Sequence, residues 1–382
     1  MKTEFEKNQK RIDDTIELKV TDRVPVVPFM LYFPIAYKGL THEFVFKHPG
    51  SARKAMQDTF MELGGFDAVF LPDYIYPSVG GRTPWAPVPR IMPGKNTQGG
   101  DQSLASFQFT EIMTHGDYDI IIEKGWNNFL LEYLPKATGR SIDKIISSQE
   151  RLMVQFMEGV RSWEEMGIPT LFGCVTTAPF DTLCSCRSFP KLSLDVYRMP
   201  KKIKAVMEAM WEDIIRNALE TVKRTGIKRV MFTLLYGSGQ YTPMHIFDEF
   251  DFPFIQRMVN LLLSEGIKVV FHMDSDYSKN MDRFLELPKG KCVLEVEFTI
   301  DIFALKEKVR GHHCIMGNVS PALLVEKTPQ DVAEYTKRLI DYVGRGGGFI
   351  LSTSCDCPLD AKIENVKAML ETGRKHQARL KD

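Results

Sequence analysis

The sequence predicts an α/β protein built as a (β/α)8 barrel. Two observations lead to this prediction: eight short apolar runs recur along the 382-residue chain, and helical patterns alternate with them. The runs are rich in β-branched and aromatic residues and are rarely interrupted by polar ones, which is typical of strands buried on both faces of a parallel sheet. A doubly wound open sheet is the alternative topology that the same alternation allows.

Each expected strand is an apolar run closed by turn formers or by a helix start. The strands, in order, are expected at Val24–Met30, Asp67–Leu71, Pro169–Val175, Lys228–Leu234, Ile267–Met273, Lys291–Val296, His313–Val319 and Gly348–Ser354. The helical patterns span Ser51–Leu63, Ile145–Met166, Lys201–Thr225, Phe247–Glu265, Lys279–Leu285, Ile302–Val309, Pro329–Val343 and Ile363–Leu380. Thr328 before Pro329 is a start signal, because Thr can cap a helix and Pro suits its first position.

Composition excludes several classes of protein. The 49 basic residues balance 49 acidic ones, so no field of a single sign attracts nucleic acid or an anionic membrane. The first fifteen residues lack the apolar core of a signal peptide, and no run approaches the ~18 apolar residues that span a bilayer. We therefore expect a cytoplasmic protein. Its seven cysteines are expected to be thiols rather than a disulfide framework.

One connection is far longer than a usual βα loop. We expect a single domain over residues 1–382, in which roughly 72–145 form an insertion after strand 2. Because it follows the carboxyl end of a strand, it would cover the barrel mouth as a lid or pocket wall. A surface insertion without a role is the alternative, but Trp85, Tyr74 and Tyr76 favour a pocket, since aromatic side chains are costly to leave in solvent.

The carboxyl ends of the expected strands carry polar side chains, and in a barrel these ends converge on one mouth. In strand order they are Tyr32, Asp73, Tyr236, His272 with Asp274, Glu295 with Glu297, Asn318, and Cys355 with Cys357. From this set we take Tyr236, Asp73 and Glu297 as candidate catalytic residues and Asn318 as the candidate cofactor-binding residue.

His272 and Asp274 are two residues apart, so on a strand they share a face and can reach one ion. Cys355 could meet them across the mouth, and this donor set suits a catalytic zinc with one open position. The alternative is a hydrogen-bonded core histidine and a small buried cysteine. Glu295 and Glu297 also share one face of their strand. They could be a metal ligand and a proton carrier, or simply partners of Arg and Lys side chains.

Common catalytic motifs do not occur in the sequence. The patterns GxSxG, GK[ST] and HExxH are missing, which removes the usual hydrolase, P-loop and zincin interpretations. The GRGGG run at 344–348 precedes a strand rather than following one, so it indicates a turn and not a phosphate-binding loop.

Several segments resemble the uroporphyrinogen decarboxylase superfamily. They include RIDDTIELKVTDRVPVVP, FDEFDFPFIQRMVNLLLSEGIKVVFHMDSD and IMGNVSPALLVEKTPQDVAEYTKRLIDYVGRGGGFILSTSCDCPLDAKIENVKAML. The resemblance covers most of the chain, is strongest over 245–372, and implies a (β/α)8 barrel. Decarboxylases of this superfamily carry an arginine-bearing segment of the type PxWxMRQAGR. This chain has no Arg between Arg23 and Arg53, so the resemblance points away from decarboxylation.

The other branch of the superfamily comprises corrinoid-dependent methyltransferases, whose zinc site is an HxC pair near strand 5 and a Cys after strand 8. His272 matches the His and Cys355 the distal Cys, whereas Asp274 stands in place of the middle Cys. A harder ligand leaves a more Lewis-acidic ion, which suits a leaving oxygen better than a thiol nucleophile. Glu295 is a further candidate ligand.

The resemblance therefore implies an O-demethylase-type methyltransferase. It would move a methyl group from a methylated small molecule, an aryl methyl ether by preference, to the Co(I) corrinoid of a partner protein. Zinc would activate the leaving group, and Tyr236 or Asp73 would supply a proton. The alternatives are a methylcorrinoid:thiol or folate methyltransferase, a uroporphyrinogen decarboxylase, and a non-catalytic barrel that binds a methylated ligand.

Overall fold

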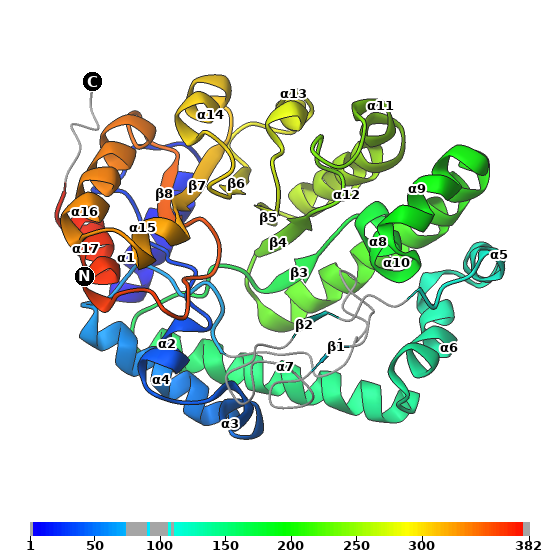
Figure 1. Ribbon diagram of the computed structural model, residues 1–382, viewed down its shortest axis with the longest axis horizontal. Coiled ribbons are helices and arrows are strands. Elements are labelled where there is room, and N and C mark those ends of the chain that lie inside the picture. Colours follow the sequence, from blue (N-terminus) through cyan, green and yellow to red (C-terminus); the bar gives the residue numbers. More distant parts are fainter. Residues whose placement is uncertain (1–2, 74–89, 92–105, 108–110, 377–382) are drawn as a thin grey trace. The chain divides into compact units, whose positions relative to one another are not determined.

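The computed structural model describes residues 3–73, 90–91, 106–107 and 111–376 (Figure 1). The chain divides into two compact units, which are described separately. Unit 1 comprises Met1–Ile75, Gln155–Phe172 and Val270–Asp382, and unit 2 comprises Tyr76–Val154 and Gly173–Val269.

Unit 1 holds the amino-terminal helices and the carboxyl-terminal strands with their helices. Its first helices are α1 (Glu4–Ile16), α2 (Phe33–Tyr37), α3 (His42–Lys47) and α4 (Pro49–Glu62). Its strands are β5 (Lys268–Met273, whose first two residues belong to unit 2), β6 (Cys292–Val296), β7 (Cys314–Val319) and β8 (Phe349–Thr353). The helices between and after them are α13 (Met281–Phe284), α14 (Ile302–Val309), α15 (Pro321–Val325), α16 (Pro329–Arg338) with the π-helical turn η4 (Leu339–Val343), and α17 (Ile363–Lys375); η3 (Ser278–Asn280) is a 3-10 turn.

The strands of unit 1 are parallel neighbours in the order β5-β6-β7-β8. The row continues past β8, because Val26 forms a parallel bridge with Leu351. The amide of Asp67 then donates to the carbonyl of Val26, and Val69 forms a parallel bridge with Thr170. The row β5-β6-β7-β8 is thus continued by the segments around Val26, Val69 and Thr170, which is the strand order of a (β/α)8 barrel.

Unit 2 contains β3, β4 and a long helix, α10. Its strands are β3 (Cys174–Thr176) and β4 (Arg229–Leu234), which pair in parallel, and the antiparallel two-residue pair β1 (Arg90–Ile91) and β2 (Ser106–Phe107). Its helices are α5 (His115–Lys124), α6 (Trp126–Thr138), α8 (Pro179–Arg187), α9 (Phe189–Arg198), α10 (Pro200–Thr225), α11 (Met244–Ile246), η2 (Phe247–Asp251) and α12 (Phe252–Ser264). Helix α7 (Ile142–Glu165) begins in unit 2 and ends in unit 1.

The buried side chains follow the periods that the sequence displays. In α10 the fully buried residues include Ile203, Met207, Met210 and Ile214, which recur at three- and four-residue spacing and so form one face. Helix α10 begins with Pro200 and ends at Gly226 in the left-handed conformation, which needs no Cβ. Strands β6, β7 and β8 are buried at every position, as both faces of a parallel sheet require.

The predicted α/β barrel fold is confirmed, and β4 to β8 lie within one residue of their expected bounds at each end. The predicted strand Val24–Met30 is wrong in its extent, since only Val26 forms a bridge. Pro25 and Pro28 lack an amide hydrogen, and the amide of Val26 donates to the carboxylate of Asp67 instead of a strand. The expected strand at Asp67–Leu71 is likewise reduced to a bridge at Val69.

The expected insertion at 72–145 lies partly outside the described residues, and so do Tyr74, Tyr76 and Trp85. Its described part includes α5, α6 and the start of α7. The lid over the mouth and the single domain over 1–382 therefore stay predictions. Among the described residues, no helix combines the length and the hydropathy needed to span a bilayer.

Candidate functional site

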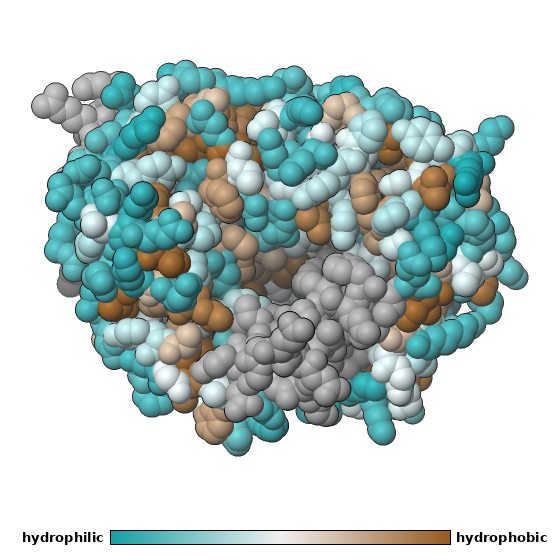
Figure 2. Space-filling model, in the orientation of Figure 1, coloured by the Kyte–Doolittle hydropathy of each residue, from teal (hydrophilic) through white to brown (hydrophobic). Residues whose placement is uncertain are grey.

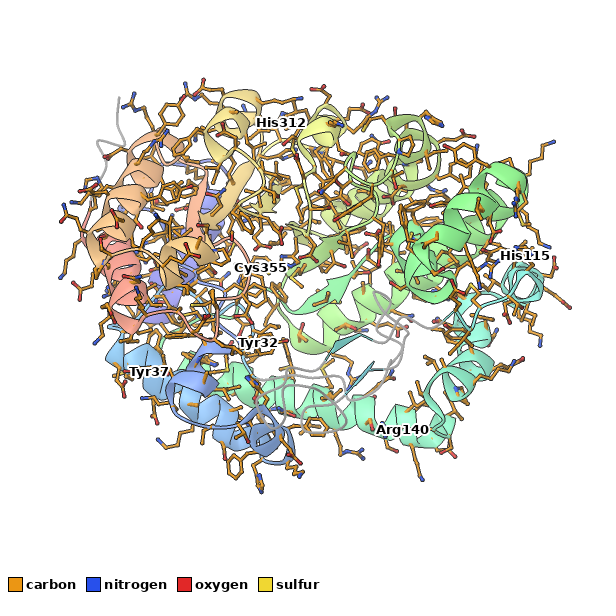
Figure 3. The ribbon with its side chains drawn as sticks, viewed as in Figure 1. Tyr32, Tyr37, His115, Arg140, His312 and Cys355 are labelled. Atoms are coloured by element: carbon orange, nitrogen blue, oxygen red, sulfur yellow. The ribbon has the colours of Figure 1, made fainter. Side chains whose placement is uncertain are left out.

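Three predicted metal ligands come together in unit 1. His272 is the penultimate residue of β5, and Asp274 follows that strand. Cys355, which Figure 3 labels, lies in the loop after β8. One donor atom from each lies within 4.8 Å of the others. His272 Nε2 is 2.9 Å from Asp274 Oδ1. His272 is buried, whereas Asp274 and Cys355 keep some exposed surface.

The second ring nitrogen of His272 contacts a different carboxylate. His272 Nδ1 forms a close ion pair with Glu295 Oε2, and Glu295, in β6, is 1% exposed. Its other oxygen, Oε1, has no hydrogen-bond partner among the described residues. A histidine held on one nitrogen by a carboxylate presents the other to a metal, as in carboxylate–histidine–zinc arrangements. Glu295 thus lies behind His272 and outside the three-residue group.

The carboxylates dominate the electrostatics of the group. Burial alone would lower the pKa of His272, but Asp274 and Glu295 outweigh it and raise that pKa well above its usual value. Burial raises the pKa of the Cys355 thiol to about 12, although His272 opposes the shift. The half-buried Glu297 follows β6, and burial, followed by the charge of Asp274, raises its pKa.

The loop that carries Cys355 is attached to the segment around Phe29. The Thr353 Oγ1 atom accepts from the amide of Phe29 at 3.1 Å, and the amide of Cys357 donates to the carbonyl of Phe29 at 2.8 Å. The buried Oδ1 of Asp356 accepts from the amide of Leu31 at 2.9 Å. The sequence analysis missed Phe29 and Asp356; the acid between the two cysteines of CDC was the signal for Asp356.

Asn318 and Asp73 are engaged within unit 1. The side-chain amide of Asn318 donates to the carbonyl of Ile300 at 3.3 Å, and its oxygen accepts from the Tyr335 hydroxyl at 2.9 Å. It therefore ties β7 to the loop after β6. Asp73 is fully buried, and its Oδ2 lies 3.1 Å from Arg53 Nε in an ion pair.

Tyr236 belongs to unit 2, where it follows β4. Its ring stacks on Phe189 with centroids 5.1 Å apart, and its amide donates to Asp181 Oδ1 at 2.9 Å. Burial, followed by the charges of Cys184 and Asp181, raises the pKa of its hydroxyl to about 12. Tyr236 is therefore protonated at neutral pH and can donate a hydrogen bond.

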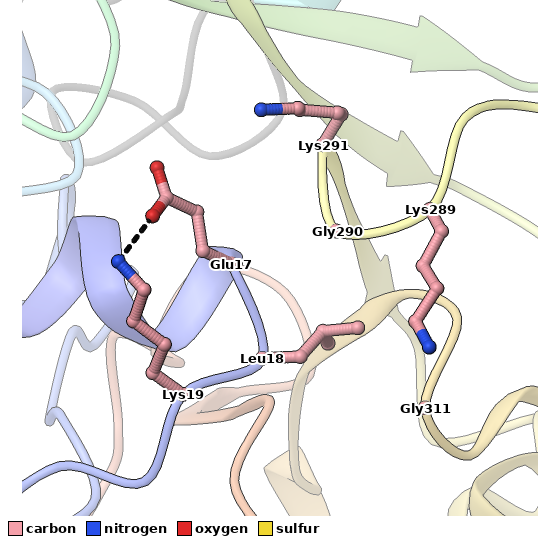
Figure 4. Close-up of a pocket in the computed structure, with 7 residues that line it drawn as sticks. All are labelled: Glu17, Leu18, Lys19, Lys289, Gly290, Lys291 and Gly311. Carbon is pink, nitrogen blue, oxygen red and sulfur yellow. Dashed lines mark hydrogen bonds and ion pairs between the residues drawn. The ribbon is translucent and has the colours of Figure 1, made fainter.

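A separate pocket of about 600 Å³ lies in unit 1 where α1 ends, beside the loops that precede β6 and β7 (Figure 4). Its lining includes Lys19, which forms a 2.7 Å ion pair with Glu17, and also Lys289 and Lys291. These loops are at the amino ends of the strands, whereas barrels keep their chemistry at the carboxyl ends. We assign this pocket no part in the site.

The donor set fits a divalent cation. An imidazole, a carboxylate and a thiol converge, and a buried carboxylate oxygen of Glu295 lacks a hydrogen-bond partner among the described residues. A cation would compensate this negative charge, and nitrogen, oxygen and sulfur ligands in this number are typical of zinc. Fold and site together define a (β/α)8 protein with a candidate metal centre at the carboxyl ends of β5 and β8.

Comparison with known proteins places the chain in a family. The model of the uroporphyrinogen decarboxylase (URO-D) family matches residues 142–376, more than half of the chain. The chain therefore belongs to the uroporphyrinogen decarboxylase family.

Curated relatives include the uroporphyrinogen decarboxylases of Methylococcus capsulatus, 23% identical over 192 residues, and Legionella pneumophila, 25% identical over 191 residues. Each match covers 49% of this chain and 52% of the relative, so the chain spans about half the length of these relatives. A solved methyltransferase from Methanosarcina mazei superposes with a TM-score of 0.70 at 14% identity, covering 96% of this chain and 98% of that one. This likeness shows the fold.

Proposed function

We propose that the chain transfers a methyl group from an aryl methyl ether to the Co(I) corrinoid of a partner protein. The observation that carries the proposal is the convergence of His272, Asp274 and Cys355 within 4.8 Å, with Glu295 on the far nitrogen of His272. The structural similarity to a methyltransferase supports it. The methyl group would leave the ether oxygen for cobalt, the electron pair of the C–O bond would stay on oxygen, and the product would be a phenol.

His272, Asp274 and Cys355 would hold zinc, and Glu295 would orient His272. Bound zinc would supply a Lewis acid that stabilises negative charge on the departing oxygen. Asp274 in place of a softer thiolate favours an oxygen-containing donor over a thiol. The residues themselves would position the ether and exclude water from the buried side of the site.

Glu297 is the proposed proton carrier. Glu297 is half-buried, and burial, followed by the charge of Asp274, raises the pKa of its carboxyl above the ordinary value, so it takes up a proton more readily than an exposed glutamate does. A role for the Tyr236 hydroxyl as a proton donor stays a prediction, because Tyr236 belongs to unit 2. We assign Asp73 no proton transfer, because its carboxylate is held in the ion pair with Arg53.

Decarboxylation of a porphyrin receives little support from the arginines. Arg23 is bound to the carboxylate of Asp67 at 2.6 Å and Arg53 to Asp73 at 3.1 Å. No Arg lies between them in the sequence, yet a substrate with many carboxylates needs cationic donors that are available to it.

The test is to follow the cobalt absorbance of a corrinoid protein. The metal-loaded chain is incubated with Co(I) corrinoid protein and methoxyaromatics, and separately with methylcobalamin and thiols. We expect methylation of cobalt in the first mixture. Demethylation of methylcobalamin alone would assign the reverse half-reaction, and formation of coproporphyrinogen from uroporphyrinogen without either change would refute methyl transfer.

A further inference from the structure

Phe29 lies beside the candidate metal centre, where both its backbone and its ring make contacts. Its amide and carbonyl bind Thr353 and Cys357, the residues two before and two after Cys355. Its ring lies 5.9 Å from the ring of His272, centroid to centroid, at 73°. The backbone of Phe29 is therefore attached to the residues on both sides of Cys355, and its ring lies beside His272.

The ring of Phe29 belongs to a stacked aromatic array. It lies parallel to Phe70, with centroids 3.9 Å apart and planes 10° apart, and Phe70 meets Phe172 edge-on at 5.1 Å. Phe70 and Phe172 are buried, whereas Phe29 is partly exposed. Phe70 covers one face of the Phe29 ring and restricts its movement. Because Phe29 alone of the three rings keeps exposed surface, it is the ring that a ligand can contact.

We infer that Phe29 is the specificity-determining platform on which the aromatic ring of the methyl donor stacks beside His272, Asp274 and Cys355. This inference deepens the proposed function and rests on it for the identity of the ligand as a methyl donor. A rigid aromatic ring offers an offset-stacked contact that a saturated ring of the same size cannot match. The platform thus selects an aryl ether over an alkyl ether, while the polar group of the donor faces the metal ligands.

The test compares binding of 2-methoxyphenol and its saturated counterpart 2-methoxycyclohexanol to the full chain, without corrinoid, by ligand-observed NMR titration. Phe29→Leu and Phe29→Met both remove the ring and keep apolar volume. The control is Phe44→Leu, because Phe44 is 42% exposed and stacks on His48 in unit 1. Metal content is measured for every variant.

We expect wild type and Phe44→Leu to prefer the aromatic ligand, and either Phe29 variant to lose about 3- to 10-fold of that preference with metal content unchanged. Retention of the preference in a folded Phe29 variant, or its absence from wild type, would overturn the inference. This binding test contains no cobalt, so it is independent of methyl transfer. If the chain prefers the aromatic ligand through Phe29 but methylates no corrinoid, the proposed function is refuted and the inference about Phe29 is kept.

Discussion

Asp251 is a buried acid that lies outside the candidate centre. It lies in unit 2 at the end of η2, is fully buried, and neither carboxylate oxygen has a hydrogen-bond partner among the described residues. Burial, reinforced by the charge of Asp181, raises its pKa well above the usual value. Folding therefore keeps a proton on Asp251 that the unfolded chain releases near pH 4.

Asp251→Asn should flatten the dependence of stability on pH. A raised folded pKa stabilises the fold below the unfolded value and costs about 1.4 kcal/mol per pH unit above it, until the folded pKa is reached. Wild type is thus expected to lose stability as the pH rises from about 4 towards the raised folded pKa, and the Asn variant to lose much less. Urea unfolding across this range measures it; parallel pH profiles would contradict the assignment of a buried neutral acid.

Substitution of Glu295 is expected to weaken metal binding, whereas substitution of Glu297 is expected to slow proton transfer. Glu295→Gln keeps a polar contact to His272 but removes its charge, so we expect ~10- to 100-fold weaker metal binding. Glu297→Gln should keep the metal and lower the rate of methyl transfer. Competition against a chromogenic chelator measures the affinities, and equal metal affinity in both variants would argue against the orienting role of Glu295.

At the scale of elements, local sequence signals predicted most strands and only some helices. Strands β4 to β8 are short, mostly apolar segments that are buried at nearly every position, and such segments are recognisable in the sequence. Helix α1 was missed although Thr3 and Glu6 form a capping box, a signal readable in the sequence. Helix α6 was missed because its residues, Trp126–Thr138, lie within the range assigned to the insertion, 72–145.

Gly173 marks a close approach between the start of β3 and the end of α10. A Cβ atom there would lie 2.4 Å from Thr225 Oγ1 and 2.8 Å from Ile227 Cβ. Gly173→Ala should therefore destabilise the chain by about 1–3 kcal/mol through overpacking. The control is Gly116→Ala in α5, where a new Cβ meets nothing closer than 3.7 Å; chemical denaturation giving equal stabilities for both variants would contradict the packing.

At the scale of the molecule, the barrel fold and its proposed metal ligands were predictable, but their surroundings were not. The resemblance and the strand ends pointed to His272, Asp274 and Cys355 as candidates. The side of His272 that Glu295 occupies, and the contact of Phe29 with the Cys355 loop, depend on contacts between distant segments. Local patterns do not encode such contacts.

The surface shown in Figure 2 carries both hydrophilic and hydrophobic side chains. Hydrophilic side chains spread over the face seen in Figure 2, with smaller hydrophobic patches between them. The sequence carries equal numbers of acidic and basic residues, so net charge gives no direction to partner binding. Recognition of a corrinoid protein would then depend on local surface features.

The metal content of the purified chain tests the central claim most directly. Wild type and Cys357→Ala, which alters the neighbouring cysteine of the same loop, are compared with Cys355→Ala by elemental analysis, after circular dichroism establishes that each is folded. We predict about one zinc per chain in the first two proteins and its loss from Cys355→Ala. Zinc retained in Cys355→Ala, or a metal-free wild type that methylates cobalt at full rate, would contradict the metal centre proposed for His272, Asp274 and Cys355.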